Sequence, residues 1–281
     1  MKKLLNILCI TLAVIFTLSL FSGCTPKESP VEDFEYKVHN DSTVSITKYI
    51  GTDKDVVIPS KIEGMPVTTI GRAFYNKEIE SVYMPDSITY ISVDAFFNCD
   101  NLTSIRFSKN LEVIDIQAFY SCNSIKELEF PSSIKEIRAN AFENCVSLTS
   151  ITIPHAETIG ISAFGQNTSL TEINLGSIKE INASFVGCTS LTEITIPAGD
   201  IKLSTPFMGC SALTTIYFEG NAPKLEEGAR TFIDIATPYN KEEQQRTQLD
   251  VTFYYKRGTT GWDEGDWLEI SKKENFHIVK Q

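Results

Sequence analysis

The strongest pattern of apolar positions in the chain is a repeat with a period of about 22 residues. A small residue followed by Phe recurs seven times, and the phenylalanines are spaced 22, 23, 23, 22, 21 and 22 residues apart. They are Phe74, Phe96, Phe119, Phe142, Phe164, Phe185 and Phe207. Self-similarity at a fixed period of this length is typical of proteins built by stacking one structural unit many times.

The residues after each Phe follow a common order. The third is Cys in most units, the sixth is Leu or Ile, and an apolar-x-apolar motif such as Ile105-Arg106-Phe107 comes next. Since side chains alternate along a strand, this motif predicts a short strand, which a Pro such as Pro131 or Pro154 often ends. A second apolar pair follows, as at Ile88 and Ile91. One unit cannot bury its own apolar face, so we expect the units to stack, with strands about 4.8 Å apart and the Phe column as an aromatic spine.

Residues 34–66 have a different pattern and predict an N-terminal β cap. Apolar and polar residues alternate over residues 34–38 and again over residues 44–46, and turn-forming residues occupy positions 40–42. This order predicts a β-hairpin. A further short strand is expected just before Pro59.

From about Gly220 the repeat is lost, and we expect residues 220–281 to form a C-terminal cap. A long polar stretch is followed by Val-Thr-Phe-Tyr-Tyr at residues 251–255, which predicts a last strand that covers the open end of the stack. We interpret Trp262 and Trp267 as packed inside this cap, with a sugar-stacking platform as the alternative.

The pattern Ala-Phe-x-x-Cys-x-x-Leu-x-x-Ile-x-Ile-Pro resembles the BspA-type leucine-rich repeats of bacterial surface proteins, from about Val67 to Phe218. The resemblance implies a β-rich, right-handed solenoid of about seven coils, each of 21–23 residues, over residues 67–219. It implies function more loosely, because a fold hosts many functions. Members of the family are typically exported or surface-bound, and several are described as adhesins or binders of host proteins.

The N-terminus resembles a bacterial lipoprotein signal peptide. Two lysines and an apolar stretch lead to Leu20-Phe21-Ser22-Gly23-Cys24, which matches a lipobox except that Phe21 stands where Leu is usual. The resemblance implies a signal peptide over residues 1–23, a lipid on Cys24 and an extracytoplasmic, lipid-anchored protein. A plain cleaved signal and an uncleaved anchor helix are the alternatives. Residues 24–33 are polar and hold two prolines, so we expect a flexible tether there.

Charge narrows the classes of function. The 281 residues include 36 acidic and 25 basic side chains, for a formal net charge of −11. Removal of a signal peptide that holds two lysines and no acid would lower the charge to −13. This balance argues against a general nucleic-acid binder, whose affinity depends on Lys and Arg beside phosphates. It favours a partner whose contact surface is neutral or basic.

Residues with catalytic or metal-binding chemistry are sparse. The chain has three widely separated histidines and no Gly-rich phosphate loop, HExxH or GxSxG motif, so we predict no enzyme activity, no cofactor and no metal site. Asp53 and Asp55 are a weak calcium signal, because the loop lacks a Glu at the required spacing.

Apart from Cys9 and Cys24 in the N-terminal segment, the cysteines of the chain lie in one column of the repeat. These are Cys99, Cys122, Cys145, Cys188 and Cys210, and Asn167 fills the position in one unit. We favour buried free thiols whose S–H satisfies a turn carbonyl, a role that the Asn amide can also fill. Disulfides are the alternative, but side chains in one column point the same way, which is poor disulfide geometry.

The outward strand positions are the candidate binding surface. The residue between the two inward positions of each strand motif reads, down the stack, Tyr83, Arg106, Glu129, Thr152, Asn174, Thr195 and Tyr217. The adjacent column reads Ser81, Ser104, Glu127, Ser150, Glu172, Glu193 and Thr215. A merely solvated face is the simplest interpretation of these columns. The functional hypothesis is a ligand platform with Tyr83, Arg106 and Tyr217 as anchors, because Tyr and Arg often dominate binding energy, and with Glu127, Glu129 and Glu172 as its acidic centre.

These observations favour a monomeric, non-enzymatic binding or adhesion module at the bacterial cell surface. Its expected partner is a protein or glycan, for example one from a host. Two alternatives stay open. One is a structural envelope protein, and the other is an accessory subunit with an unrecognised ligand or catalytic site in the C-terminal segment.

The lipoprotein interpretation makes a direct prediction. Cys24→Ser removes the thiol that would carry the lipid, so the variant protein is expected in the medium or unprocessed, because stable anchoring needs more than one acyl chain. Mass spectrometry of the mature N-terminus is the measurement. An unmodified N-terminus at another position in the wild-type protein would contradict the interpretation.

Overall fold

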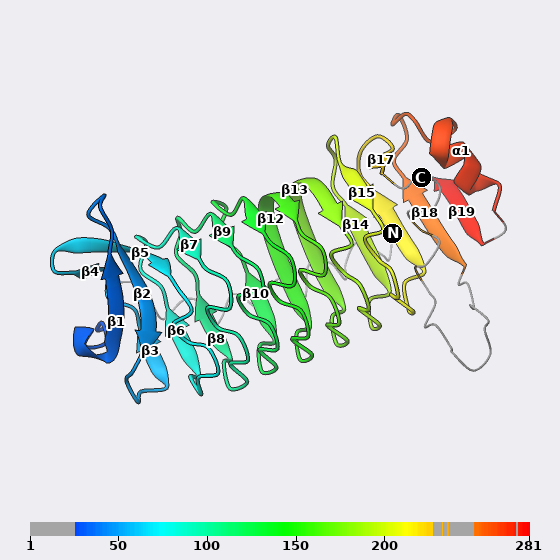
Figure 1. Ribbon diagram of the computed structural model, residues 1–281. Helices are drawn as coiled ribbons and strands as arrows, with labels where there is room; N and C mark the ends of the chain where they lie inside the picture. Colours follow the sequence, from blue (N-terminus) through cyan, green and yellow to red (C-terminus); the bar gives the residue numbers. More distant parts are fainter. Residues whose placement is uncertain (1–25, 227–231, 233–234, 236–249, 274) are drawn as a thin grey trace, which may run out of the picture.

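In the computed structural model, successive turns of the chain stack along one direction, and each turn adds strands to two rows that run along the molecule (Figure 1). The structure describes residues 26–226, 232, 235, 250–273 and 275–281. The predicted β-solenoid is confirmed, and it has about nine turns where the repeat predicted about seven. The additional turns come from the caps, whose strands join the same rows.

The first row contains the strands predicted from the apolar-x-apolar motif. Its members are β3 (Asp55–Val57), β6 (Ser81–Tyr83), β8 (Ser104–Arg106), β10 (Glu127–Glu129), the first halves of β12 (Ser150–Ile159) and β13 (Glu172–Asn182), β14 (Glu193–Ile196), β16 (Thr215–Phe218), β18 (Val251–Tyr255) and β19 (Phe276–Lys280). Paired neighbours are parallel and in register, so that Val82 lies beside Ile105 and Ile194 beside Ile216. This register keeps the apolar residues on the inner side of the row.

The second row follows the second apolar pair of each unit, which the sequence pattern did not identify as strands. Its members are β2 (Val44–Tyr49), β5 (Met65–Ile70), β7 (Tyr90–Ile91), β9 (Val113–Ile114), β11 (Glu136–Ile137), the second halves of β12 and β13, β15 (Lys202–Ser204) and β17 (Lys224–Leu225). They are parallel, and Ile70, Ile91, Ile114 and Ile137 form one buried column. Strands of two residues hold their shape only because both neighbouring turns bond to them.

Two strands in the middle of the molecule cross both rows. The prediction that Pro154 ends a strand is wrong, because Pro154 lies inside β12, together with His155. The reason is the length of the coil: Ile159 follows Ile151 by eight positions, whereas Ile137 follows Leu128 by nine. With one residue fewer, the chain has no room for the turn and runs extended. Gly176 of β13 lies beside Pro154, whose carbonyl oxygen would be 1.9 Å from a Cβ at that position, so only glycine fits.

The seven phenylalanines form the predicted aromatic spine. Each is fully buried. Ring centroids of Phe74 and Phe96 are 4.7 Å apart, and the spacing widens to 6.0 Å between Phe185 and Phe207. Tyr49 of β2 extends the stack at the N-terminal end, with its centroid 5.3 Å from Phe74.

Residues with positive φ lie two positions after each spine Phe, and two positions before all of them except Phe74, and make the turn possible. Two residues before Phe these are Asp94, Gln117, Asn140, Ser162, Ala183 and Thr205, and two residues after it Asn76, Asn98, Ser121, Asn144, Gln166, Gly187 and Gly209. Asn, Asp and Gly tolerate this left-handed conformation best, which accounts for their frequency here. Backbone hydrogen bonds tie each turn to the next, such as Phe96 N–H to the Ala118 carbonyl at 2.7 Å.

The cysteine column confirms the prediction of buried free thiols. Each thiol donates to the carbonyl of a spine Phe in the preceding coil, with Sγ to O distances of 3.0–3.2 Å, as from Cys145 to Phe119. Asn167 makes the same bond with its amide, at 3.1 Å to the Phe142 carbonyl. Burial raises the pKa of the Cys145 thiol to about 12, so it stays protonated and unreactive. Cys24 lies outside the described residues.

The N-terminal cap is the predicted hairpin, in which β1 (Phe34–Val38) pairs with β2 in antiparallel orientation. A short strand β4 (Lys61–Ile62) pairs with β5. The prediction of a flexible tether over residues 24–33 is wrong for its second half. Ser29 donates its N–H to the Val57 carbonyl at 2.9 Å and accepts the Val57 N–H at 3.0 Å, and the 3₁₀ helix η1 (Val31–Asp33) follows. These residues cover the edge of β3, which would otherwise present unpaired backbone groups.

The C-terminal cap continues the first row with β18 and β19 and adds the helix α1 (Gly265–Ser271). Trp262 and Trp267 are each 4% exposed and pack against Phe218 and each other, which confirms their interpretation as cap packing. The indole N–H of Trp267 donates to the Pro223 carbonyl at 3.0 Å. No helix in the described part of the chain has the length and apolar composition needed to cross a membrane.

The spine predicts the effect of core truncation. Phe119→Ala is expected to lower the free energy of unfolding by about 3–5 kcal/mol, as for other buried Phe truncations, with the loss of protection centred on its own coil and the two neighbours. Thermal or denaturant unfolding with amide hydrogen exchange is the measurement.

Phe97 supplies the matched control. It is half-buried outside the spine, stacked between Tyr75 and Tyr120 at 5.1 and 5.0 Å. Its truncation is expected to cost about 0.5–1.5 kcal/mol, with a further contribution from its partial burial. Equal losses for the two variants would show that the spine has no special role.

Candidate binding surface

The outward side chains of the first row form what we call the first face. Tyr83 lies beside Arg106, Glu129 beside Thr152, and Thr195 beside Tyr217 in strand register. The residues that precede or follow them, such as Val82, Leu128 and Ile216, are buried. The predicted columns of outward residues are therefore present, as the alternation of side chains requires.

The first face is divided into three groups of strands. Backbone pairing is absent between β8 and β10 and between β13 and β14, as the sheet orders of the described residues show. Tyr83 and Arg106 belong to the N-terminal group, and Tyr217 belongs to the C-terminal group. The acidic residues Glu127, Glu129 and Glu172 lie in the middle group. The structure thus brings the predicted site residues onto one face without gathering them into one pocket.

Tyr83 and Arg106 are already engaged with each other. The Arg106 guanidinium carbon lies 4.2 Å from the centre of the Tyr83 ring. A cation over an aromatic face at this distance is stabilising. Tyr83 is half-buried and Arg106 is exposed, so the pair presents a positive, flat patch to the solvent.

The three acidic residues of the middle group are all exposed. Glu127 and Glu129 lie on β10, and Glu172 lies on β13, where it accepts a hydrogen bond from the Asn174 amide at 2.9 Å. Glu193 of β14 is exposed on the same face. This part of the face is negative.

Tyr217 has a partner that the sequence pattern did not find. Its ring stacks on Tyr254 of β18, with centroids 5.2 Å apart and ring planes 18° apart. Burial, followed by the negative charge of Glu193 and the neighbouring Tyr254, raises the pKa of Tyr217. Tyr254 was missed because the polar stretch before β18 breaks the period. The signal that would have found it is alignment of residues 251–255 with the strand at 215–218.

A shallow hollow of about 390 Å³ lies on the first face where β13 and β14 separate. Its lining residues are Thr152, Pro154, Ile173, Asn174, Leu175, Gly176, Thr195 and Glu219. The hollow exists because the outward residues at its centre are small or short.

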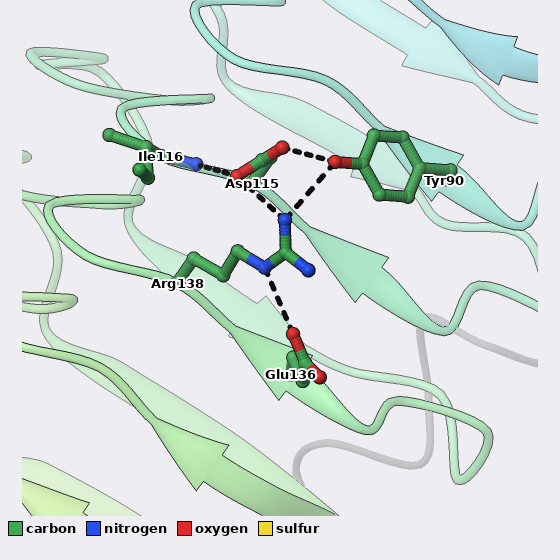
Figure 2. Close-up of polar contacts among 5 residues, drawn as sticks. All are labelled: Tyr90, Asp115, Ile116, Glu136 and Arg138. Carbon is green, nitrogen blue, oxygen red and sulfur yellow. Dashed lines mark hydrogen bonds and ion pairs between the residues drawn. The ribbon is translucent and has the colours of Figure 1, made fainter.

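The outward side chains of the second row form the second face, which carries a cluster of charged residues that sequence reasoning missed (Figure 2). Arg138 forms ion pairs with Asp115 at 3.2 Å and with Glu136 at 2.9 Å, and it donates to the Tyr90 hydroxyl at 3.3 Å. Tyr90 in turn donates to the second oxygen of Asp115. The Ile116 N–H donates to Asp115 at 2.8 Å. The cluster joins three successive turns of the solenoid.

The environment of Asp115 determines its charge state. Its burial would raise the pKa of the carboxyl, but the hydrogen bonds from Tyr90 and Ile116 and the guanidinium of Arg138 outweigh burial, so the pKa lies below its ordinary value of 3.8. The hydrogen bond to Glu136 is the largest cause that raises the pKa of Arg138. Burial and the bond to Asp115 raise the pKa of Tyr90. These groups satisfy one another, so the cluster holds the second face rigid.

A second shallow hollow, of about 590 Å³, lies farther along the second face. It is lined by residues of both charges, among them Glu157, Lys179, Glu180 and Lys202. Lys179 pairs with Glu157 at 3.2 Å. The mixed charge gives this hollow no preference for one sign of ligand.

The weak calcium signal has another explanation. Asp53 uses its backbone carbonyl to accept the Tyr49 hydroxyl at 2.9 Å, and Asp55 accepts the Ser81 hydroxyl at 2.5 Å. Over the residues that the structure describes, no three His, Cys, Asp or Glu side chains form a group that could hold a metal ion.

The repeat region is similar to known proteins. The profile of the BspA-type leucine-rich repeat region matches residues 68–184 and 136–237, in six copies. Among solved structures, a leucine-rich repeat protein of T. pallidum shares 30% sequence identity over 59% of this chain and 91% of its own, with a TM-score of 0.48. One from Bacteroides capillosus shares 28% identity over 46% of this chain and 97% of its own, with a TM-score of 0.39.

A further solved structure is that of a leucine-rich cell surface protein of Faecalibacterium prausnitzii. It shares 18% identity over 76% of this chain and 98% of its own, with a TM-score of 0.34. No curated protein sequence matches the chain.

The charged cluster on the second face makes stability depend on pH. Because the folded state lowers the pKa of Asp115, its contribution to stability is complete above the unfolded pKa of about 3.9 and is lost as the pH falls through the lower folded value. Asp115→Asn should therefore be less stable than the wild type at pH 7, and the difference should shrink below about pH 4.

Melting temperatures of both proteins between pH 7 and pH 2.5 are the measurement. Glu35→Gln is the control, because the Glu35–Lys48 pair is exposed and such pairs contribute little. A difference between wild type and Asp115→Asn that stays constant over this range would show that the cluster is not coupled to the charge of Asp115.

Proposed function

The chain belongs to the BspA-type leucine-rich repeat family, and on that premise we propose that it is a non-enzymatic binding and adhesion protein of the bacterial cell surface, anchored there by a lipid on Cys24. The proposal assigns binding to the first face and assigns the spine and the second face to holding that surface in shape.

The observation that carries the proposal is the register of the first face. Parallel in-register strands place outward side chains in straight columns, with aromatic residues at both ends and acidic residues between them. At about 4.8 Å per paired coil, with wider spacing where pairing is absent, Tyr83 and Tyr217 are at least about 29 Å apart, which is too far for one small molecule. A partner that uses both ends must therefore be a polymer, either a protein or a glycan.

Charge supports the same proposal. The middle of the face is acidic, and the mature chain would carry −13. A partner that is neutral or basic at its contact surface avoids repulsion there. Association with a basic partner should also slow as salt rises, because long-range attraction is screened.

The burial of Trp262 and Trp267 removes the main support for a sugar platform in the C-terminal segment. Both indoles pack inside the cap, and both indole N–H groups already have acceptors, Thr259 and the Pro223 carbonyl. We therefore assign the described part of this segment to closing the stack.

The test is a search for ligands followed by a matched pair of triple variants. The purified protein is screened on protein and glycan arrays, and Tyr83→Ala, Arg106→Ala and Tyr217→Ala are combined in one chain. Loss of the three anchor side chains should weaken binding of the ligand by at least about tenfold, since aromatic and Arg anchors often carry most of the binding energy.

The control combines Arg72→Ala, Tyr75→Ala and Tyr120→Ala. These residues have the same types and similar burial, and Arg72 lies 3.6 Å from the Tyr75 ring centre, but they stand beside the spine and not on the first face. The control should bind like the wild type if it folds. Unchanged binding by the first-face variant, or equal loss in both variants, would reject the first face as the binding site.

A further inference from the structure

Over the residues that the structure describes, the ring of Tyr217 has an aromatic partner on one face and neither an aromatic nor a cationic partner on the other. Tyr254 covers the face on the β18 side, at a centroid distance of 5.2 Å. The strand on the other side is β14, and the residue in register there is Thr195. The Thr side chain is too short to cover an aromatic ring. The open face of Tyr217 is therefore directed toward the space above Thr195.

That space is continuous with the hollow on the first face. Thr195 and Glu219 both line the hollow. Tyr217 lies beside Thr195 in strand register, and it precedes Glu219 by two residues in the chain. The floor is made of Ile173, Leu175 and the backbone at Gly176. The hollow thus has an apolar floor and a polar rim, and Tyr217 stands on the strand beside it, next to Thr195.

The charged groups around the hollow are mostly acidic. Glu172 and Glu193 are exposed on the strands that separate there, and Glu193 acts on Tyr217 through its charge. Glu219 lines the hollow and pairs with Lys256 at 3.2 Å. One lysine therefore faces three carboxylates, and a cation entering the hollow gains more attraction than repulsion.

The chain itself shows what fits beside an outward Tyr. Arg106 covers the ring of Tyr83 from the neighbouring strand, with the guanidinium carbon 4.2 Å from the ring centre. Arg72 also covers the ring of Tyr75, at 3.6 Å, although these two residues belong to one turn beside the spine. Tyr217 is in the same column as Tyr83, but Thr195 occupies the place where Arg106 would be.

We propose that the hollow beside Tyr217 receives an arginine side chain from a protein partner, with its guanidinium on the open ring face and paired with the carboxylates of Glu193 and Glu219. The planar guanidinium suits both contacts, because it stacks on aromatic rings and binds carboxylates through a fork of N–H groups. The partner would present this arginine on an extended or looped segment that lies across the small side chains of the hollow. This inference rests on the proposed function of the first face and names the chemistry of its partner.

The test uses three fluorescently labelled peptides of equal length. Each has one central residue, which is arginine, lysine or citrulline, and Gly and Ser at all other positions. Lysine keeps the charge without the planar group, and citrulline keeps the shape without the charge. The purified protein should bind the arginine peptide more tightly than either of the others. Fluorescence anisotropy at low salt is the measurement, and a neutral oligosaccharide is the fourth probe.

Two variants act on the site from opposite directions. Tyr217→Ala removes the stacking surface, and Thr195→Arg places the protein's own guanidinium where the ligand's would lie, as Arg106 does beside Tyr83. Each should weaken binding of the arginine peptide by about tenfold. Tyr120→Ala and Thr158→Arg are the matched controls, because they remove a half-buried Tyr or add an Arg outside the first face, and both should bind the arginine peptide like the wild type.

The outcomes separate this inference from the proposed function. Failure of the arginine peptide to bind, equal binding of the lysine peptide, or equal losses in the site and control variants would overturn it. Binding of the oligosaccharide that Tyr217→Ala abolishes would replace the arginine with a sugar. If an array ligand needs the first face while the arginine peptide does not bind, only this inference fails. If the arginine peptide binds and depends on Tyr217, but no array ligand depends on the first face, the arginine site stands. The proposal that the whole first face binds a protein or glycan then fails.

Discussion

The structure depends on one constraint: a coil of about 22 residues can bury its apolar side chains only against the coils above and below it. The spine phenylalanines, the inward Ile and Val residues of both strand rows and the Cys column all make their main contacts between turns and not within one. Many hydrogen bonds of the turns also run from coil to coil, such as the bond from the thiol of Cys145 to the carbonyl of Phe119. The two ends of the stack therefore need caps, and both caps build strands into the existing rows.

The same constraint produces the candidate binding surface. Register between coils places residues of equal position in line, so a column of outward side chains is a direct consequence of a column of inward ones. Where the coil length changes, the surface changes too. The shorter coils let β12 and β13 run through both rows, and pairing stops beyond β13 on the first face, where the hollow lies. The hollow therefore lies beside the two coils that are one residue shorter than their neighbours.

The two faces differ in how their charges are used. On the second face, Asp115, Arg138 and Tyr90 satisfy one another across three turns, which leaves them little capacity to bind a ligand. On the first face, Glu127 and Glu129 are exposed on the middle strands, and Tyr217 has one open ring face. This contrast is the reason that we place binding on the first face. The outward Tyr at each end also differs, since Tyr83 is covered by the chain's own arginine and Tyr217 is not.

The sequence by itself determined the features that repeat. The period of Phe74 and its equivalents predicted the solenoid and the buried spine. The Cys column predicted free thiols bonded to turn carbonyls. The alternation of side chains along strands predicted that Tyr83, Arg106 and Tyr217 point outward. Tertiary structure alone decided the features that the periodic pattern of the sequence does not show. The two-residue strands of the second row exist only through bonds to their neighbours, Ser29 pairs with Val57 across 28 residues, and Arg138 reaches Tyr90 across 48. Tyr254 joined the column of Tyr217 although a polar stretch separates them in the chain. A periodic pattern records what each coil shares with the next, whereas these contacts depend on backbone pairing between coils or join residues at different positions of the repeat, so they are decided only when the coils are stacked.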